Sequence, residues 1–454
     1  MAFDCKVQIP RVLICAPKSG SGKTLISCAL MRILKRRGYN VAAFKCGPDY
    51  IDPMFHKKVL EVPSRNLDLF MAGEEGVKKT LRAGTLGEDI AIIEGVMGFF
   101  DGLSALSVEG SSHDLCKKTK TPALLVVDAK GMSRSVIPLI KGFMDYGQDK
   151  GKAVIRGVIL NNISPMIVRD ISGEIEKELD IPVLGFLPKL EGELFTSRHL
   201  GLVLPKEIPD ILEKVDLVAD KLEESLDLEK LLEIAKEAGV LSIDSNDKTE
   251  DRVHTRVGIA LDEAFCFYYE DNLDLLKKMG AEIKFFSPIH DKEIPEVDRL
   301  ILGGGYPELY GKKLMDNISM RESIKKAAME GMPILAECGG FLYLQKSMTD
   351  IDGNSAMMAG VLEGESHMTS KLSHFGYVNV TALLDNPYLK MGETMKGHEF
   401  HYYDTTDNGC FLKMTKPLGK RSWEGYQCWK NVFGGFTHLY YPSNKEYVKR
   451  FLSL

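Results

Sequence analysis

The sequence predicts an α/β protein with two domains, each built around a sheet that helices cover. Three observations predict this class. Short apolar runs alternate with stretches able to form helices through the first half of the chain, a glycine-rich turn follows the first run, and the alternation starts again after a polar segment. Apolar strands separated by helices are typical of a parallel sheet that is buried on both faces.

The N-terminal domain is expected to begin with a strand at residues 11–17, which the glycine-rich turn connects to a helix that ends near Arg37. Further apolar runs are expected to be buried strands, at residues 41–46, 90–96, 123–129, 155–160 and 183–187. Residues 209–238 have Leu, Glu, Asp and Lys at helical spacing. We therefore expect a first domain at residues 1–240, with a parallel sheet and helices on both faces.

A polar stretch follows, and we expect residues 241–252 to be an interdomain linker. The alternation then starts again, with expected strands at residues 257–261, 283–286, 299–302 and 333–336. From about His374 to Tyr441 the sequence has more strand-like and aromatic character. These features predict a second α/β domain at residues 253–454.

The net charge of the chain is −6, and this mild negative charge gives no support to nucleic-acid binding, which normally needs a basic face. We recognise no signal peptide, and no apolar stretch approaches the roughly 18 residues of a membrane span. Nine cysteines at irregular spacing favour reduced thiols over disulfides or a zinc site. We therefore expect a cytoplasmic protein with no nucleic-acid or membrane partner, and the sequence leaves a homodimer open.

A phosphate-binding loop is expected in the turn after the first strand, where residues 16–24 read APKSGSGKT. Its glycines let backbone N–H groups close around phosphate oxygens at a helix N-terminus. Lys23 is expected on the β- and γ-phosphates of ATP, and the Thr24 hydroxyl on Mg²⁺. Pro17 replaces the usual first glycine, so the loop matches the deviant subclass with an early lysine. The expected nucleotide contacts are Lys18, Ser19, Gly20, Ser21, Gly22, Lys23 and Thr24.

Acidic residues after the expected strands are candidates for the metal and phosphate site. Asp49 and Glu94 are expected to bind Mg²⁺, which prefers oxygen ligands. Asp52 and Asp101 are expected near the substrate or the phosphates. A single carboxylate is more often a helix cap or a solvated charge, but ligands of a nucleotide-binding sheet gather at this edge.

A nucleophile is expected at Cys338, where an apolar strand runs directly into Cys-Gly-Gly and a helical stretch. A sharp strand-to-helix turn exposes the thiol, and the helix N-terminus favours its thiolate. The backbone N–H groups of Gly304 and Gly339 are expected to form an oxyanion hole. His438 is the best candidate for the base. The alternative is a buried structural cysteine with an unrelated histidine.

His398 and His401, in the segment GHEFHY, compete with His438 for the role of base. A metal pair, substrate contacts and a structural role all stay open for them, because a spacing of three residues is weak evidence.

These motifs together resemble a known family. The N-terminal half resembles the P-loop amidoligases related to dethiobiotin synthetase, and the C-terminal half resembles a class I glutamine amidotransferase domain. The combination, in this order and length, resembles the cobyrinate a,c-diamide synthase family of cobalamin biosynthesis. The segments that carry the resemblance are KSGSGKT, KCGPDYIDPMFH, SRNLDLFM, IIEGVMGFFDG, LILGGGYPELY, AECGGFLYL, GHEFHYYD and GGFTHLYY.

The resemblance implies a ligase that uses ATP, Mg²⁺ and glutamine to amidate the a and c carboxylates of the corrinoid cobyrinate through an acyl phosphate. It implies that Asn162, or its neighbour Asn161, contacts the adenine base. Most triad glutaminases have Glu two residues after the histidine, whereas this chain has Tyr440. The glutaminase is therefore expected to use a Cys–His dyad.

Three alternatives stay open. The same chemistry fits hydrogenobyrinate or nickel-sirohydrochlorin as the substrate. A cobyric acid synthase, which amidates the other peripheral carboxylates, resembles this chain in both domains. A P-loop partitioning or regulatory ATPase is favoured by Lys18, but the segments AECGG and GGFTHLYY argue against it.

Overall fold

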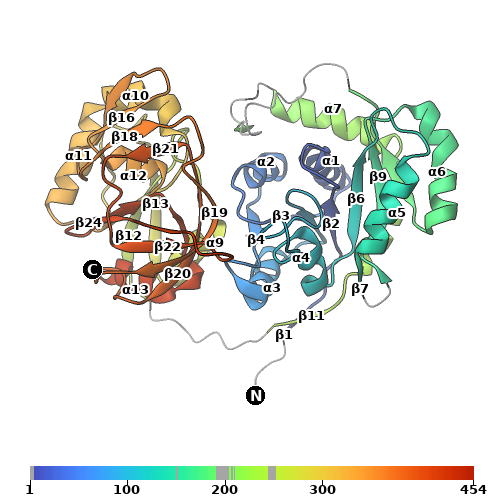
Figure 1. The fold of residues 1–454 in the computed structure, drawn as a ribbon, viewed down its shortest axis with the longest axis horizontal. Helices are drawn as coiled ribbons and strands as arrows, with labels where there is room; N and C mark the ends of the chain where they lie inside the picture. Colours follow the sequence, from blue (N-terminus) through green and yellow to red (C-terminus); the bar gives the residue numbers. More distant parts are fainter. Residues whose placement is uncertain (1–4, 150–151, 191–203, 206–207, 209, 244–251) are drawn as a thin grey trace. The chain divides into compact units, whose positions relative to one another are not determined.

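A computed structural model describes residues 5–149, 152–190, 204–205, 208, 210–243 and 252–454. The chain divides into two compact units, Met1–Asp247 and Lys248–Leu454, and each contains a largely parallel sheet with helices (Figure 1). The predicted α/β class is confirmed. Within the range expected to be a linker, Leu241–Ile243 form strand β11, which pairs with β1 (Cys5–Val7). Residues 244–251 of that range lie outside the described residues.

The first unit is built around a seven-stranded sheet in the order β10-β9-β6-β2-β5-β3-β4, and every neighbouring pair is parallel. The strands are β2 (Arg11–Cys15), β3 (Val41–Cys46), β4 (Ser64–Leu67), β5 (Ile90–Glu94), β6 (Ala123–Asp128), β9 (Ile155–Asn161) and β10 (Val183–Phe186). All but β4 correspond to predicted apolar runs. The sequence analysis missed β4 because its residues, Ser-Arg-Asn-Leu, are mostly polar.

Helices cover both faces of this sheet (Figure 1). On one face α1 packs against both α2 and α7. The helices are α1 (Lys23–Arg36), α2 (Ile51–Leu60), α3 (Gly73–Gly84), α4 (Ser112–Thr119), α5 (Val136–Tyr146), α6 (Pro165–Leu179), α7 (Ile211–Glu223) and α8 (Leu228–Lys236). Because both faces are covered, β2, β3 and β5 are buried along their whole length, as their apolar sequences require.

The second unit contains a six-stranded sheet in the order β13-β12-β14-β15-β25-β24, parallel except for the β24–β25 pair. Its strands are β12 (Thr255–Ala260), β13 (Ala281–Phe286), β14 (Arg299–Leu302), β15 (Ile334–Glu337), β24 (Gln427–Trp429) and β25 (Val432–Gly435). The helices of this unit include α9 (Glu270–Lys278), α11 (Ile318–Met329), α12 (Gly339–Leu344) and α13 (Lys445–Ser453).

The strand-like region near the C-terminus forms mainly a five-stranded antiparallel sheet in the order β23-β22-β19-β20-β26. Its strands are β19 (His374–Ala382), β20 (Thr394–His401), β22 (Leu412–Thr415), β23 (Ser422–Gly425) and β26 (His438–Tyr440). The chain passes from the parallel sheet at β25 to this second sheet at β26, and that passage positions one of the candidate catalytic residues.

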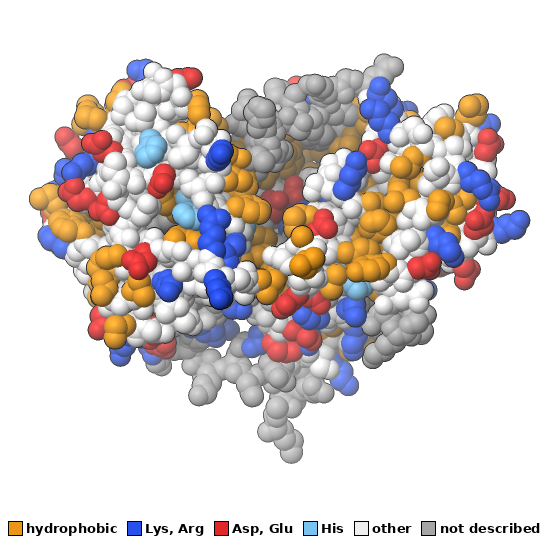
Figure 2. Space-filling model, viewed as in Figure 1, with side chains coloured by type: hydrophobic (Ala, Val, Ile, Leu, Met, Phe, Trp, Pro, Cys, Tyr) orange, Lys and Arg blue, Asp and Glu red, His pale blue; other side chains and the backbone are white. Residues whose placement is uncertain are grey.

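Acidic and basic side chains are interspersed over the surface in view of each unit (Figure 2). Among the described residues, no helix combines the length and the apolar character that crossing a membrane requires.

Candidate functional site

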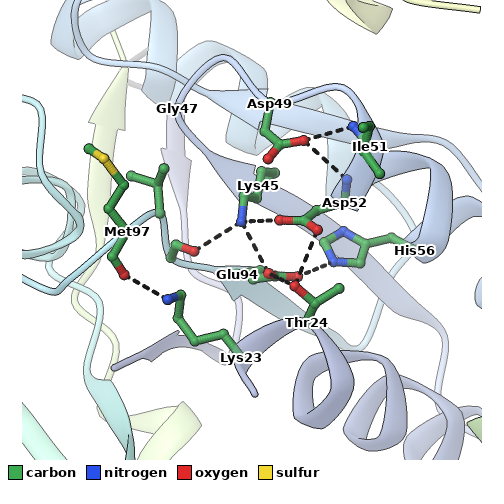
Figure 3. Close-up of polar contacts among 12 residues, drawn as sticks. Lys23, Thr24, Lys45, Gly47, Asp49, Ile51, Asp52, His56, Glu94 and Met97 are labelled. Atoms are coloured by element: carbon green, nitrogen blue, oxygen red, sulfur yellow. Dashed lines mark hydrogen bonds and ion pairs between the residues drawn. The ribbon is translucent and has the colours of Figure 1, made fainter. Parts of the chain in front are cut away.

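The glycine-rich loop lies where the sequence predicts, between β2 and α1. Gly20 and Gly22 have φ angles of 77° and 96°, which favour glycine. A Cβ on Gly22 would overlap the side chain of Asn161, whose Nδ2 donates to the Ser21 carbonyl over 2.9 Å. Lys23 Nζ donates to the Met97 carbonyl at 2.6 Å, so its ammonium lies beside the loop that follows β5 (Figure 3).

Carboxylates converge on the first turn of α1. The Thr24 hydroxyl donates to Glu94 Oε1 at 2.6 Å and is 3.2 Å from Asp52 Oδ1 (Figure 3). Glu94 ends strand β5 and is fully buried. Asp49 Oδ1 accepts from the backbone N–H groups of Ile51 and Asp52, and so caps α2 next to this cluster. The structure therefore brings together Thr24, Asp49, Asp52 and Glu94.

Two further residues complete the cluster, and the sequence analysis missed both. Lys45 Nζ forms an ion pair with Asp52, lies 3.1 Å from Glu94 Oε1, and donates to the Gly95 carbonyl. His56 Nε2 lies 2.8 Å from Glu94 Oε2 (Figure 3). A lysine inside the apolar strand Val-Ala-Ala-Phe-Lys-Cys was a usable signal, because a buried charge needs a partner.

Burial and the neighbouring charges set the protonation of this cluster. For Glu94, burial alone raises the carboxyl pKa, but Lys45 and the hydrogen bond with His56 outweigh it and hold the pKa well below its usual range. Burial and the Glu94 charge raise the pKa of Asp52. Burial lowers the pKa of Lys45, but Asp52 and Glu94 reverse this and raise it. In this cluster the positive charge of the buried Lys45 ammonium partly compensates the negative charge of the carboxylates.

This donor set fits a hard divalent cation beside a nucleotide. The Thr24 hydroxyl meets one carboxylate oxygen of Asp52 and one of Glu94 directly after the glycine-rich loop, and Mg²⁺ prefers such oxygen ligands. That Thr24, Asp49 and Glu94 hold the ion stays a prediction.

Asp101 and Asn162 each hold a loop at the edge of the sheet. Asp101 Oδ2 accepts from the Gly98 N–H at 2.8 Å, within the loop after β5. Asn162 Nδ2 donates to Asp128 Oδ1 at 3.0 Å, after β9. Their contacts with substrate and adenine stay predictions.

In the second unit, Cys338 occupies a sharp turn between β15 and α12. Its φ of 48° and ψ of −107° are strained for a residue with a side chain. Its N–H donates to the Gly435 carbonyl at 2.8 Å, and the side chain is largely buried. A Cβ on Gly340 would overlap the Leu302 carbonyl, so the turn requires this glycine. The predicted elbow is therefore present.

The predicted oxyanion loop and base gather at the same turn. The imidazole of His438 packs directly on Gly304, where a Cβ would overlap Cε1. The Gly340 N–H donates to the Gly303 carbonyl at 2.9 Å, which ties α12 to the loop after β14. Gly339 begins α12 next to Cys338. The structure thus brings Gly304, Gly339, Cys338 and His438 together.

Burial favours the neutral form of both candidate catalytic groups. Burial raises the pKa of the Cys338 thiol above its ordinary value, and the charge of Glu308 raises it further. Burial lowers the pKa of His438 to about 3, and His398 and His401 contribute to this shift. A neutral imidazole can act as a base, and a neutral thiol can donate a proton to it. Tyr440, at the position of the usual acid, donates instead to Asp271 at 2.8 Å.

The structure separates His398 from His401. Both lie on β20, but an odd spacing places their side chains on opposite faces of the strand. His398 contacts the rings of Phe375 and Tyr377, whereas His401 lies beside Glu399. The two histidines therefore do not form a metal pair, which was one of the options left open.

Comparison with known proteins identifies a domain family for each half of the chain. Residues 12–194 match the model of the CobQ/CobB/MinD/ParA nucleotide binding domain, and residues 256–446 match that of the CobB/CobQ-like glutamine amidotransferase domain.

Relatives match the chain over nearly its full length. A cobyrinate a,c-diamide synthase from Listeria innocua is 41% identical over 96% of this chain and 97% of the relative. The protein of the same name from Caldanaerobacter subterraneus is 40% identical over 97% of each chain, and that from Picrophilus torridus is 40% identical over 98% of this chain and 99% of its own. The chain belongs to the cobyrinate a,c-diamide synthase family.

Proposed function

We propose that this chain amidates the a and c side-chain carboxylates of cobyrinate, using ATP and glutamine, in cobalamin biosynthesis. The observation that supports the proposal is that one chain combines a glycine-rich loop with a carboxylate cluster and a cysteine elbow with a histidine on its glycine loop. The name of relatives that match over nearly the whole chain supports the corrinoid substrate.

The glutaminase half supplies ammonia. Cys338 Sγ attacks the side-chain carbonyl of glutamine while His438 takes the thiol proton, and that proton then leaves with the departing ammonia. The N–H groups of Gly304 and Gly339 stabilise the oxyanion. Water hydrolyses the resulting thioester to glutamate and restores the thiol. Local release matters because free ammonia is mostly protonated at neutral pH.

The synthetase half makes the carboxylate reactive. A substrate carboxylate oxygen attacks the γ-phosphorus of ATP, ADP leaves, and ammonia then displaces phosphate from the acyl phosphate to give the amide. Lys23 and the backbone N–H groups of the loop hold the phosphates. Mg²⁺, when bound, supplies positive charge for the phosphate oxygens. Lys45, which pairs with Asp52 and Glu94, adds a further positive charge beside this site.

Mass spectrometry of the product tests the proposal. The pure protein is incubated with ATP, glutamine and one tetrapyrrole at a time: cobyrinate, hydrogenobyrinate or nickel-sirohydrochlorin. We expect two amides on cobyrinate. More than two added amides would indicate a cobyric acid synthase. Two amides added only to another tetrapyrrole would identify that tetrapyrrole as the substrate. ATP hydrolysis without any amide would favour a regulatory ATPase.

The two halves are tested separately with Cys338→Ser. This variant loses amidation with glutamine and keeps it with ammonium salts, because the synthetase site is distinct. Retained activity with glutamine would refute the glutaminase assignment. We place the reaction in the cytoplasm, where cysteines stay reduced. Light scattering on the active preparation reports whether it is a homodimer.

A further inference from the structure

The connection that carries His438 is a two-residue passage between two sheets. Strand β25 ends at Gly435 in the parallel sheet, Phe436 and Thr437 follow, and His438 opens β26 at the edge of the antiparallel sheet. A change in the backbone conformation of Phe436 or Thr437 therefore moves the imidazole of His438. Both residues are buried, and each contacts a side chain of β20.

Glu399 holds Thr437. The carboxylate is 1% exposed, and its Oε1 accepts from the Thr437 hydroxyl and, at 3.3 Å, from Trp423 Nε1. On the other side, the Tyr426 hydroxyl donates to the Thr437 carbonyl at 2.5 Å. Thr437 is thus fixed at its side chain and at its carbonyl, directly before the base.

His401 holds Phe436. The two rings stack with centroids 4.0 Å apart and planes only 6° apart. Phe436 also contacts Phe341, on α12 three residues beyond Cys338, with ring centroids 5.3 Å apart and planes at 84°. His401 is itself fixed, because Nδ1 is 2.7 Å from the Tyr403 carbonyl and Nε2 is 3.4 Å from Glu399 Oε2. One stack therefore joins His401 to the nucleophile helix.

From this geometry we propose that Glu399 and His401 are positioning residues for the glutaminase reaction. They fix the passage at Phe436 and Thr437, and so orient His438, a task that the acid absent at position 440 performs in triad enzymes. This inference rests on the proposed glutaminase activity of Cys338. It also gives a role to the segment GHEFHYYD, which the two active sites otherwise leave unexplained.

An alternative role for these residues is to bind a metal ion. His374, Glu399 and His401 present ligand atoms within 4.8 Å of one another. Two features disfavour a cation at this cluster. The guanidinium of Arg421 lies over Trp423, and its positive charge repels a cation. Oε1 of Glu399 already accepts a hydrogen bond from Thr437. A role in positioning His438 explains these contacts without a metal ion. The experiment below distinguishes the positioning role from metal binding.

The experiment measures amidation with glutamine and with ammonium salts in four variants. Glu399→Ala removes the acceptor of Thr437, Glu399→Gln keeps an acceptor oxygen, and Thr437→Val removes only the donor. Glu424→Gln, at an exposed position on β23, is the matched control. We expect Glu399→Ala to lower kcat with glutamine by about 10–100-fold with little change in KM. Glu399→Gln recovers part of the loss, Thr437→Val lowers kcat, and the control behaves as wild type.

Activity with ammonium salts stays unchanged in every variant if the role is positioning. An unchanged kcat with glutamine in both Glu399→Ala and Thr437→Val would overturn the inference, and so would a rise in KM alone, which would indicate a glutamine contact. If Glu399→Ala does not fold, Thr437→Val decides. Stoichiometric metal in the purified enzyme, whose removal abolishes glutamine use after Mg²⁺ is restored, would also overturn it. Wild-type enzyme that forms no amide with either nitrogen source would instead refute the proposed amidation.

Discussion

His438 fills the space that a side chain on Gly304 would need, so the candidate base rests directly on the candidate oxyanion loop. This contact makes the absence of a side chain at Gly304 a requirement of the glutaminase site. It also means that a small change in the loop after β14 moves the imidazole.

Gly304→Ala therefore displaces His438. Because a misplacement of about 1 Å can lower a rate about 100-fold, we expect kcat with glutamine to fall by that order, with amidation from ammonium salts retained. Gly173→Ala on α6 is the control, since a Cβ there meets nothing within 4 Å. Full activity of Gly304→Ala with glutamine would show that His438 can shift without cost, or that it is not the base.

Alkylation of Cys338 reports its protonation. Burial raises the thiol pKa, and only the thiolate reacts, so labelling by iodoacetamide in the absence of substrates should be slow at pH 7 and should still increase at pH 9. Exposed Cys410 in the same molecule is the internal reference. Peptide mass spectrometry gives both rates. A Cys338 rate that levels off near pH 7 would mean a thiolate already formed at rest.

Lys45→Gln tests whether Lys45, which no sequence motif pointed to, stabilises the fold and takes part in amidation. The change leaves Glu94 buried without its ammonium partner, and breaking a buried ion pair costs about 3–5 kcal/mol. We expect a lower free energy of unfolding and loss of amidation with either nitrogen source. Chemical denaturation and product analysis measure the two effects. Lys58→Gln, exposed on α2, should change neither, and a fully active Lys45→Gln would exclude a role at the phosphates.

Glu337 makes stability depend on pH. Burial raises the pKa of its carboxyl to about 8, against about 4.3 for a free glutamate. Between these values the unfolded chain releases the proton and the folded chain keeps it, so this group lowers stability as pH rises. Glu337→Gln should raise the free energy of unfolding at pH 8 by on the order of 1–3 kcal/mol, and this gain should be much smaller at pH 5.

Denaturation curves at several pH values check this prediction, with exposed Glu330→Gln as the control. A gain that is larger at pH 5 than at pH 8 would contradict the proposed cause, because ionisation of Glu337 in the unfolded chain is least favourable near the free pKa.

The sequence predicted elements and sites that depend on local patterns. Buried parallel strands read as apolar runs, so six strands of the first sheet were found, whereas polar β4 was not. The phosphate loop and the cysteine elbow were found because glycines at fixed offsets mark them. Glu399 and Lys45 were not given roles, because their importance comes from contacts with residues distant in the sequence, such as Thr437 and Glu94.

The gathering of Gly304, Cys338 and His438 from three distant parts of the chain has a consequence for folding kinetics. Contacts between residues far apart in sequence form slowly, because long loops must close first. The passage at Phe436 and Thr437 can be fixed only after both sheets of the second unit exist. On refolding from denaturant, glutamine-dependent activity should therefore be the last property to return, after secondary structure has formed.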